Sequence, residues 1–140
     1  TIFYIYYLEI HMQAVTELAS SNAASKSLHV AVNILTKWKA TTEQMATILG
    51  VSTASINRAK RKGNVSLSRD QLDRVSYILN MHAALRTVFD NPENVYGFVR
   101  KRNHNPFFNG ATPFDLMVQG SMATLYEVFK RVDGLRGAQW

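Results

Sequence analysis

The sequence predicts an all-α fold in which a helix-turn-helix region is followed by a small helical domain. Apolar residues recur at spacings of three and four along most of the chain, as on one face of a helix. Ser, Thr or Asn precedes most of these stretches, where its side chain can cap a helix. Apart from residues 1–12, no segment shows the alternation that is typical of a strand. We therefore expect about six to eight helices.

Composition and charge limit the classes of function. The 140 residues are 46% hydrophobic and 19% charged, which is typical of a globular chain. The lack of cysteine excludes disulfides and thiolate metal sites and favours a reducing, cytoplasmic location. The formal net charge of +6 permits a polyanionic partner, and residues 51–75 carry six Lys or Arg against two Asp. The positive potential therefore lies next to the glycine bend at Gly50, where any search for a phosphate-binding site must start.

The stretch TIFYIYYLEIHM has neither the basic start nor the small-residue cleavage site of a signal peptide. It is too short to span a bilayer, and it contains Glu9. Two interpretations stay open: either Met12 is the natural start and residues 1–11 are not native, or the stretch packs on the domain or on a second chain. Residues 1–27 are assigned to an N-terminal extension, and no membrane partner is predicted.

The expected helices of the first half begin at recognisable caps. Thr41 and Gln44 form the pattern T-x-x-Q, and Ser68 and Gln71 form S-x-x-Q, which are both capping boxes. The helix before the first box has an apolar face made by Leu28, Ala31, Leu35 and Trp38. The helix after the second box has a long apolar stripe made by Leu72, Val75, Leu79, His82, Leu85 and Phe89.

The second half repeats these signals. Asn91-Pro92 and Thr112-Pro113 each place a cap residue before a proline at the first helical position. Ser121 opens a last helix, whose apolar face is Met122, Leu125, Phe129 and Val132. Loops are expected at residues 63–67 and 103–111. The chain is accordingly divided into residues 28–88, the helix-turn-helix region, and residues 89–140, the second helical domain.

The segment ATILGVSTASINRAKRKG predicts two short helices that cross at a steep angle. Ala46 is small enough for the helices to approach closely, and Gly50 takes the turn, where a positive φ costs other residues about 1 kcal/mol. Val51 and Ile56 are expected to fill the angle between the helices. Ser52 is placed to cap the second helix.

The second of these helices presents a polar and basic outer side. Its N-terminal part can enter the major groove, where Asn pairs with adenine and Arg with guanine, and where Lys suits phosphates. The alternative is a helical hairpin whose basic face is only solvated. One such unit contacts a half-site, so a homodimer is expected. The predicted DNA-binding residues are Ser52, Thr53, Ser55, Asn57, Arg58, Lys60, Arg61 and Lys62.

No pattern of an active site is found, so the chain is not expected to be an enzyme. Its four histidines are scattered and show no metal-ligand spacing, and the glycines form no phosphate-cradling loop. His82 lies on an apolar helix face, where a core histidine is more common than a ligand. No cofactor, metal site or catalytic residue is predicted.

The second half resembles a known family. The matching features are NPENVYGFV, the run N-x-x-F-x-G-x-x-P-x-D-L from Asn105 to Leu116, Gly120, and the closing VFKRVDGLRGAQW. On these features the chain resembles the antitoxins of the Xre/MbcA/ParS group, which pair with RES-domain toxins. The resemblance covers residues 28–140, with both halves in the right order.

The resemblance implies a type II toxin–antitoxin system. Its antitoxin would neutralise a RES-domain toxin that consumes NAD, by covering the NAD-binding cleft with its C-terminal region. It would also bind promoter DNA through the helix-turn-helix and so regulate its own operon. The alternative is a stand-alone transcriptional regulator whose C-terminal half only dimerises.

The C-terminal tail carries residues that suit this role. An Arg fits a pocket that receives a pyrophosphate, and an indole buries a large area in a cleft. The alternative is a frayed helix end with Trp140 folded on its own core. The candidate toxin-binding residues are Lys130, Arg131, Arg136, Gly137 and Trp140.

Overall fold

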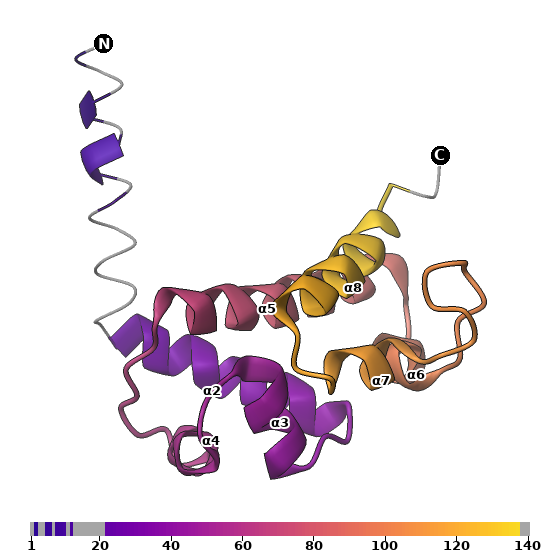
Figure 1. The fold of residues 1–140 in the computed structure, drawn as a ribbon, viewed down its shortest axis with the longest axis horizontal. Helices are drawn as coiled ribbons and strands as arrows, with labels where there is room; N and C mark the ends of the chain where they lie inside the picture. Colours follow the sequence, from indigo (N-terminus) through magenta and orange to yellow (C-terminus); the bar gives the residue numbers. More distant parts are fainter. Residues whose placement is uncertain (1, 3–4, 7, 11, 13–21, 138–140) are drawn as a thin grey trace.

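The computed structural model describes residues 2, 5–6, 8–10, 12 and 22–137, and the all-α prediction is confirmed: these residues include no strand. Residues 22–137 form seven α-helices and one 3₁₀ helix, η1 (Figure 1). Their bounds are α2 Asn22–Lys37, α3 Thr42–Leu49, α4 Thr53–Lys60, α5 Arg69–Val88, α6 Pro92–Gly97, η1 Phe98–Arg100, α7 Pro113–Met117 and α8 Met122–Gly134. Residues 22–27, predicted as part of the extension, are the first residues of α2. The open question on residues 1–11 lies largely outside the described residues.

The predicted helix caps are all present. Thr41, Ser68 and Thr112 close capping boxes, in which the side chains of the cap residue and of the residue three positions later each accept a hydrogen bond from the other's backbone N–H. Asn91 and Ser121 cap α6 and α8 through single bonds to the N–H three residues later. These contacts are local in sequence, so each helix start is fixed by its own few residues.

Helix α5 is the centre of the fold and packs on both halves of the chain. Helices α2, α3 and α4 lie on one side of it, α8 lies along the other, and α6 and α7 stand near its C-terminal end (Figure 1). One continuous hydrophobic core results, to which the two halves both contribute. Its largest fully buried side chains include Trp38 of the turn after α2, Ile56 of α4, Ile78 of α5 and Phe114 of α7.

The predicted face of α2 is confirmed, because Leu28, Ala31, Leu35 and Trp38 are all fully buried. The predicted stripe of α5 contacts the core, but it is only part of the surface that this helix buries. Leu72, Val75 and Leu85 are buried, but Leu79, His82 and Phe89 are only half-buried. The remaining buried residues of the helix are Ile78, Met81 and Ala84. A helix packed on two sides buries a broader surface than a single stripe, so the spacing of three and four does not select one face.

The α7–α8 turn rests directly on the helix-turn-helix. Gly120 has a φ of +82°, which glycine adopts without strain. A β-carbon on Gly120 would lie 2.9 Å from the Cγ2 of Thr47 on α3, closer than carbon atoms approach. The lack of a side chain at Gly120 therefore lets the second half of the chain contact α3.

Candidate nucleic-acid interface

The turn between α3 and α4 is held from both sides. Gly50 ends α3 at a φ of +65°, and its N–H donates to the carbonyl of Ala46. The Nε2 of Gln71, on α5, donates to the Gly50 carbonyl over 2.8 Å. The hydroxyl of Ser52 then accepts the N–H of Ser55 and caps α4, as predicted. The Gly50 N–H, the Gly50 carbonyl and the Ser52 hydroxyl are thus all hydrogen-bonded. These bonds hold α4 in its orientation relative to α3 and α5.

The inner face of α4 is anchored on the core. Ile56 and Ala59 are fully buried. The Nδ1 of His29, on α2, donates to the Ala59 carbonyl over 2.7 Å, and Asn33 donates to the Nε2 of the same ring over 3.2 Å. Both ring nitrogens of His29 are engaged by these contacts. Helix α4 is thus tied to α2 as well as to the turn.

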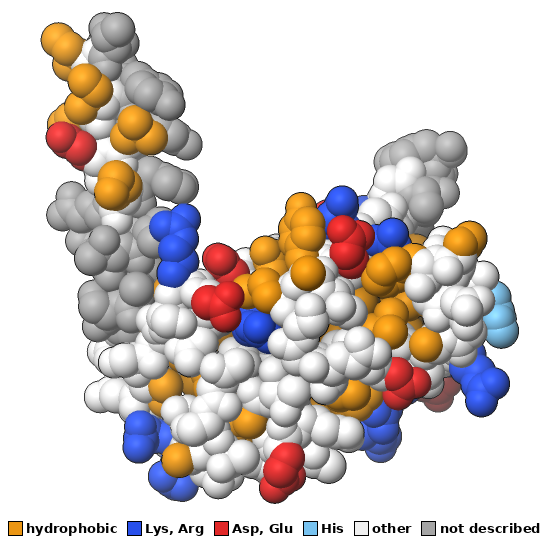
Figure 2. Space-filling view, in the orientation of Figure 1, with side chains coloured by type: hydrophobic (Ala, Val, Ile, Leu, Met, Phe, Trp, Pro, Cys, Tyr) orange, Lys and Arg blue, Asp and Glu red, His pale blue; other side chains and the backbone are white. Residues whose placement is uncertain are grey.

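The predicted DNA-binding residues lie on the side of α4 that faces away from this core. All but Ser55, which is half-buried, are exposed. Lys and Arg side chains lie at lower left in Figure 2, at the position of α4 in Figure 1. Because Ile56 and Ala59 face inward, the helical period places Asn57, Arg58 and Arg61 on the outward side. A ligand that contacts α4 from outside would meet these side chains first.

On one flank of α4, the ammonium group of Lys60 lies at the N-terminal end of α3. The Nζ of Lys60 donates to the Oγ1 of Thr42 over 2.8 Å. The N-terminal end of a helix carries a partial positive charge, so Lys60 adds to a field of the same sign. Thr42 is absent from the sequence-based prediction, because nothing in the sequence shows that α3 and the end of α4 meet.

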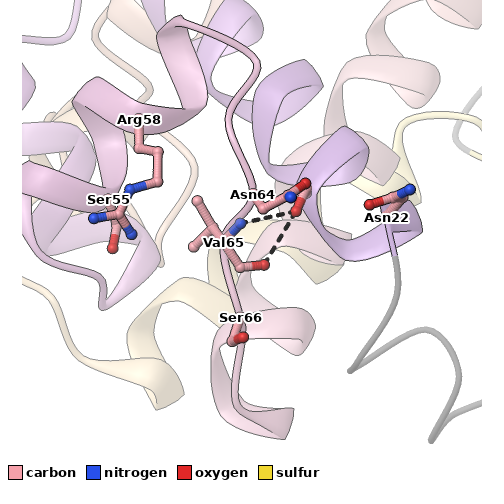
Figure 3. Close-up of a pocket in the computed structure, with 7 residues that line it drawn as sticks. Asn22, Ser55, Arg58, Asn64, Val65 and Ser66 are labelled. Carbon is pink, nitrogen blue, oxygen red and sulfur yellow. Dashed lines mark hydrogen bonds between the residues drawn. The ribbon is translucent and has the colours of Figure 1, made fainter.

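The other flank opens into a polar cleft of about 450 Å³, which is lined by Asn22, Ser25, Ser55, Arg58, Asn64, Val65 and Ser66 (Figure 3). The Ser25 hydroxyl accepts from the N–H of Val65 over 2.9 Å and donates to its carbonyl over 3.1 Å, as the dashed lines show. This pair ties the loop after α4 to α2. A neighbouring groove contains Lys26, His29 and Lys62. The cleft and the groove together offer hydrogen-bond donors and positive charge beside α4.

The candidate toxin-binding residues lie at the far end of α8 and beyond it. Lys130 places its Nζ 5.4 Å from the ring centre of Tyr126. Arg131 pairs with Glu127 and stacks on Phe107, at 3.7 Å from the guanidinium carbon to the ring centre. The hydrogen bond from Arg131 lowers the pKa of Glu127.

Two further candidate residues, Arg136 and Gly137, follow α8. Arg136 pairs with Asp133, and Gly137 is exposed. Trp140 lies outside the described residues. The toxin-binding role of these residues stays a prediction.

An aromatic cluster on α5 and α8 is not among the predicted sites. The rings of Tyr77 and Phe129 stack with their centres 4.9 Å apart, and Tyr126 lies 5.6 Å from Tyr77. Tyr126 is 41% exposed. Hydrophobic side chains over α5 and α8 are visible between acidic ones in the upper part of Figure 2. Burial, followed by Asp73, raises the pKa of Tyr77. The sequence gives little indication of this aromatic cluster, because its rings come from different halves of the chain.

The described residues contain no group of three His, Cys, Asp or Glu side chains that could hold a metal ion. Within the same part of the chain, no helix has the length and apolar character needed to cross a membrane.

Comparison with known proteins places this geometry in a family context. Residues 16–80, which include α2 to α4 and the first half of α5, match the antitoxin Xre-like helix-turn-helix domain. The chain is also similar to the uncharacterized protein y4oB of Sinorhizobium fredii (strain NBRC 101917 / NGR234). The two are 31% identical over 104 residues, which is 74% of this chain and 79% of that protein. No solved structure matches the chain.

Proposed function

The chain belongs to the family of the antitoxin Xre-like helix-turn-helix domain, and on that premise we propose that it is the antitoxin of a type II toxin–antitoxin pair. It binds the promoter of its own operon through α4, and it neutralises a RES-domain toxin through its C-terminal region. It acts by binding and carries out no reaction of its own. The observation that supports this most directly is the basic outer face of α4 within an Xre-like domain.

The DNA-binding arm follows from the arrangement around α4. Asn57, Arg58 and Arg61 face outward, where base edges of a major groove would lie. Lys60 contacts Thr42 of α3 on one flank of α4, and Lys62 lines the groove on the other. Cations on both sides of a recognition helix suit the two phosphate backbones that border the groove. One such helix reads a half-site, so the DNA-bound form is a homodimer.

The toxin-binding arm rests on the C-terminal segment. Lys130, Arg131 and Arg136 follow one another toward the end of the chain, and Gly137 and Trp140 complete the tail. In the proposal, this segment enters the NAD-binding cleft of the toxin, where Arg136 occupies the position of the pyrophosphate and Trp140 fills an apolar part. The ion pair between Arg136 and Asp133 is exposed to solvent. Replacing Asp133 by an anionic group of the partner therefore costs little free energy.

Two experiments test the role of the C-terminal segment in toxin binding. Co-expression with the RES-domain toxin should restore growth and cellular NAD, whereas a chain that ends at Asp133 should restore neither. An Arg136→Glu chain should lose most of the protection, and Lys101→Glu, a charge reversal at an exposed position outside the tail, should keep it. Full protection by the shortened chain would contradict the role of the tail.

A stand-alone regulator is the second candidate, because the family match ends at residue 80 and leaves α6, α7 and α8 outside it. In that case the second half serves dimerisation. This candidate would be favoured if the chain binds its promoter tightly but neither co-purifies with a RES-domain toxin nor protects cells from it. Promoter binding is common to both, so only the toxin experiment separates them.

A further inference from the structure

The turn that follows α4 contains a glycine, Gly63, whose presence needs an explanation. Lys62 has a φ of +59°, and its N–H donates to the Ala59 carbonyl over 3.0 Å. The N–H of Gly63 donates to the Arg58 carbonyl over 2.9 Å. This pair of bonds is the Schellman motif, whose left-handed position is usually occupied by glycine. Here Lys62 holds that position, and Gly63 follows it with a φ outside the positive range. The backbone conformation therefore gives no reason for a glycine at residue 63.

The side chain of Arg58 supplies the reason. A β-carbon at residue 63 would lie 2.7 Å from the Arg58 Cγ and 3.5 Å from its Cδ. The first distance is well inside van der Waals contact, and Cγ is too close to the backbone to move aside without a change of rotamer. Arg58 thus leaves α4 across the space above Gly63. In Figure 3 its side chain extends toward Ser55, at the mouth of the polar cleft.

We propose that Gly63 is a specificity-determining position of the DNA interface, which acts by fixing the rotamer of Arg58. The proposal rests on the proposed DNA-binding function. Gly63 does not contact the DNA and is a positioning residue. Its empty β-position selects the direction in which the Arg58 guanidinium leaves the helix, and bidentate pairing with a guanine requires a defined direction. A Gly63→Ala chain would keep every charge of the interface, while its β-carbon would displace the Arg58 side chain and lie 3.3 Å from the Arg58 carbonyl oxygen.

A double-mutant cycle on DNA affinity tests this. The probes are a duplex selected by the wild-type chain from a random-sequence library and a shuffled duplex of the same composition. Arg58→Ala and Gly63→Ala should each weaken binding to the selected duplex by about tenfold, the effect of one good base contact. The double variant should bind it no more weakly than Arg58→Ala alone. Gly63→Ala should leave binding to the shuffled duplex unchanged. Gly97→Ala, whose new β-carbon would have 4.0 Å to its nearest neighbour, is the matched control.

Each other outcome has one meaning. Losses that multiply in the double variant, or a Gly63→Ala chain that binds like the wild type, would overturn the proposal. A library in which no sequence is enriched would instead overturn the proposed DNA reading. The contact itself is tested without DNA, by nuclear Overhauser effects between the Gly63 Hα and Arg58 Hγ protons. We expect these effects in the wild type and not in Gly63→Ala. If the wild type does not show them, the inference is wrong whatever the DNA data show.

Discussion

Arg74 of α5 and Gly120 of the α7–α8 turn are joined by a hydrogen bond of 3.0 Å from the Arg74 Nη1 to the Gly120 carbonyl. The same nitrogen donates to the Ile48 carbonyl over 3.2 Å, at the end of α3. The Nε bonds to Asp70 over 3.1 Å, and only 11% of the Arg74 side chain is exposed. One guanidinium therefore holds the helix-turn-helix and the start of α8 together.

Replacing Arg74 by Met should lower the free energy of unfolding by about 2–4 kcal/mol. The carbonyls of Ile48 and Gly120 would both lose a charged donor at a largely buried site. Asp70→Asn should cost less than about 1 kcal/mol, because its carboxylate is 59% exposed and the pair is screened by water. Urea unfolding followed by circular dichroism measures both. Equal effects of the two changes would show that the ion pair, and not the two carbonyls, carries the contribution.

The contact between Gly120 and Thr47 predicts a pair of variants with unequal costs. Gly120→Ala meets both a φ of +82° and the Thr47 Cγ2, whereas Gly110→Ala meets a φ of +86° and nothing closer than 3.9 Å. The positive φ should cost about 1–2 kcal/mol in both, and the overlap should add about 1 kcal/mol or more at Gly120. Thr47→Ser, which removes the methyl group, should recover that extra part only in the Gly120→Ala background. A recovery in the Gly110→Ala background as well would contradict the contact.

Substitution of Lys62 by glycine should change stability and DNA affinity in opposite directions. Gly at a φ of +59° is relieved of the strain that Lys bears, so Lys62→Gly should raise the free energy of unfolding by about 1 kcal/mol. The same change removes one positive charge, which the proposed DNA interface assigns to a phosphate contact. It should weaken binding to all duplexes alike and reduce the slope of log affinity against log salt by about one. Fluorescence anisotropy at several salt concentrations measures this, and a loss confined to one DNA sequence would argue against a phosphate contact.

His82 should make stability depend on pH. Burial, and then the charges of Arg86 and Lys37, lower its pKa from 6.5. Its ring stacks on Tyr96, and its buried Nδ1 has no hydrogen-bond partner among the described residues. The unfolded chain therefore takes up this proton at a higher pH than the folded chain. The contribution is complete above about pH 6.5 and is lost as the pH falls from there toward the lower folded-state pKa.

The urea midpoint should accordingly decrease between about pH 7 and pH 5 in the wild type. His82→Phe should remove this part of the decrease, since phenylalanine keeps the stack on Tyr96 and cannot take up a proton. His104→Gln, at an exposed loop position, should retain it. An unchanged pH profile in His82→Phe would show that another group is responsible.

Sequence reasoning succeeds here where the determinants are local. The caps at Thr41, Ser52 and Ser68 each depend on a residue three positions away, and Gly50 depends on one turn, so short patterns contain the full information. The fold class follows from such patterns added along the chain. The face of α2 is predicted correctly for a similar reason, since that helix buries one contiguous surface.

What the sequence does not reveal depends on contacts between distant segments. Arg74 and Gly120 are 46 positions apart, and Ser25 and Val65 are 40 apart, so no pattern of short period connects them. The same holds for Lys60 and Thr42 at the flank of the interface. Arg58 and Gly63 are only five positions apart, yet their contact depends on the left-handed conformation of Lys62, which residue preference does not predict for lysine.

The central position of α5 has a consequence for the proteolysis of this chain. A chain cut after Val88 keeps α5 but strips away α8, leaving the Tyr77 ring bare and the carboxy-terminal end of α3 without its link to Gly120. A protease that nicks the second half therefore also undermines the first. In the proposed antitoxin, one cleavage in the second half would therefore impair DNA binding and toxin binding together.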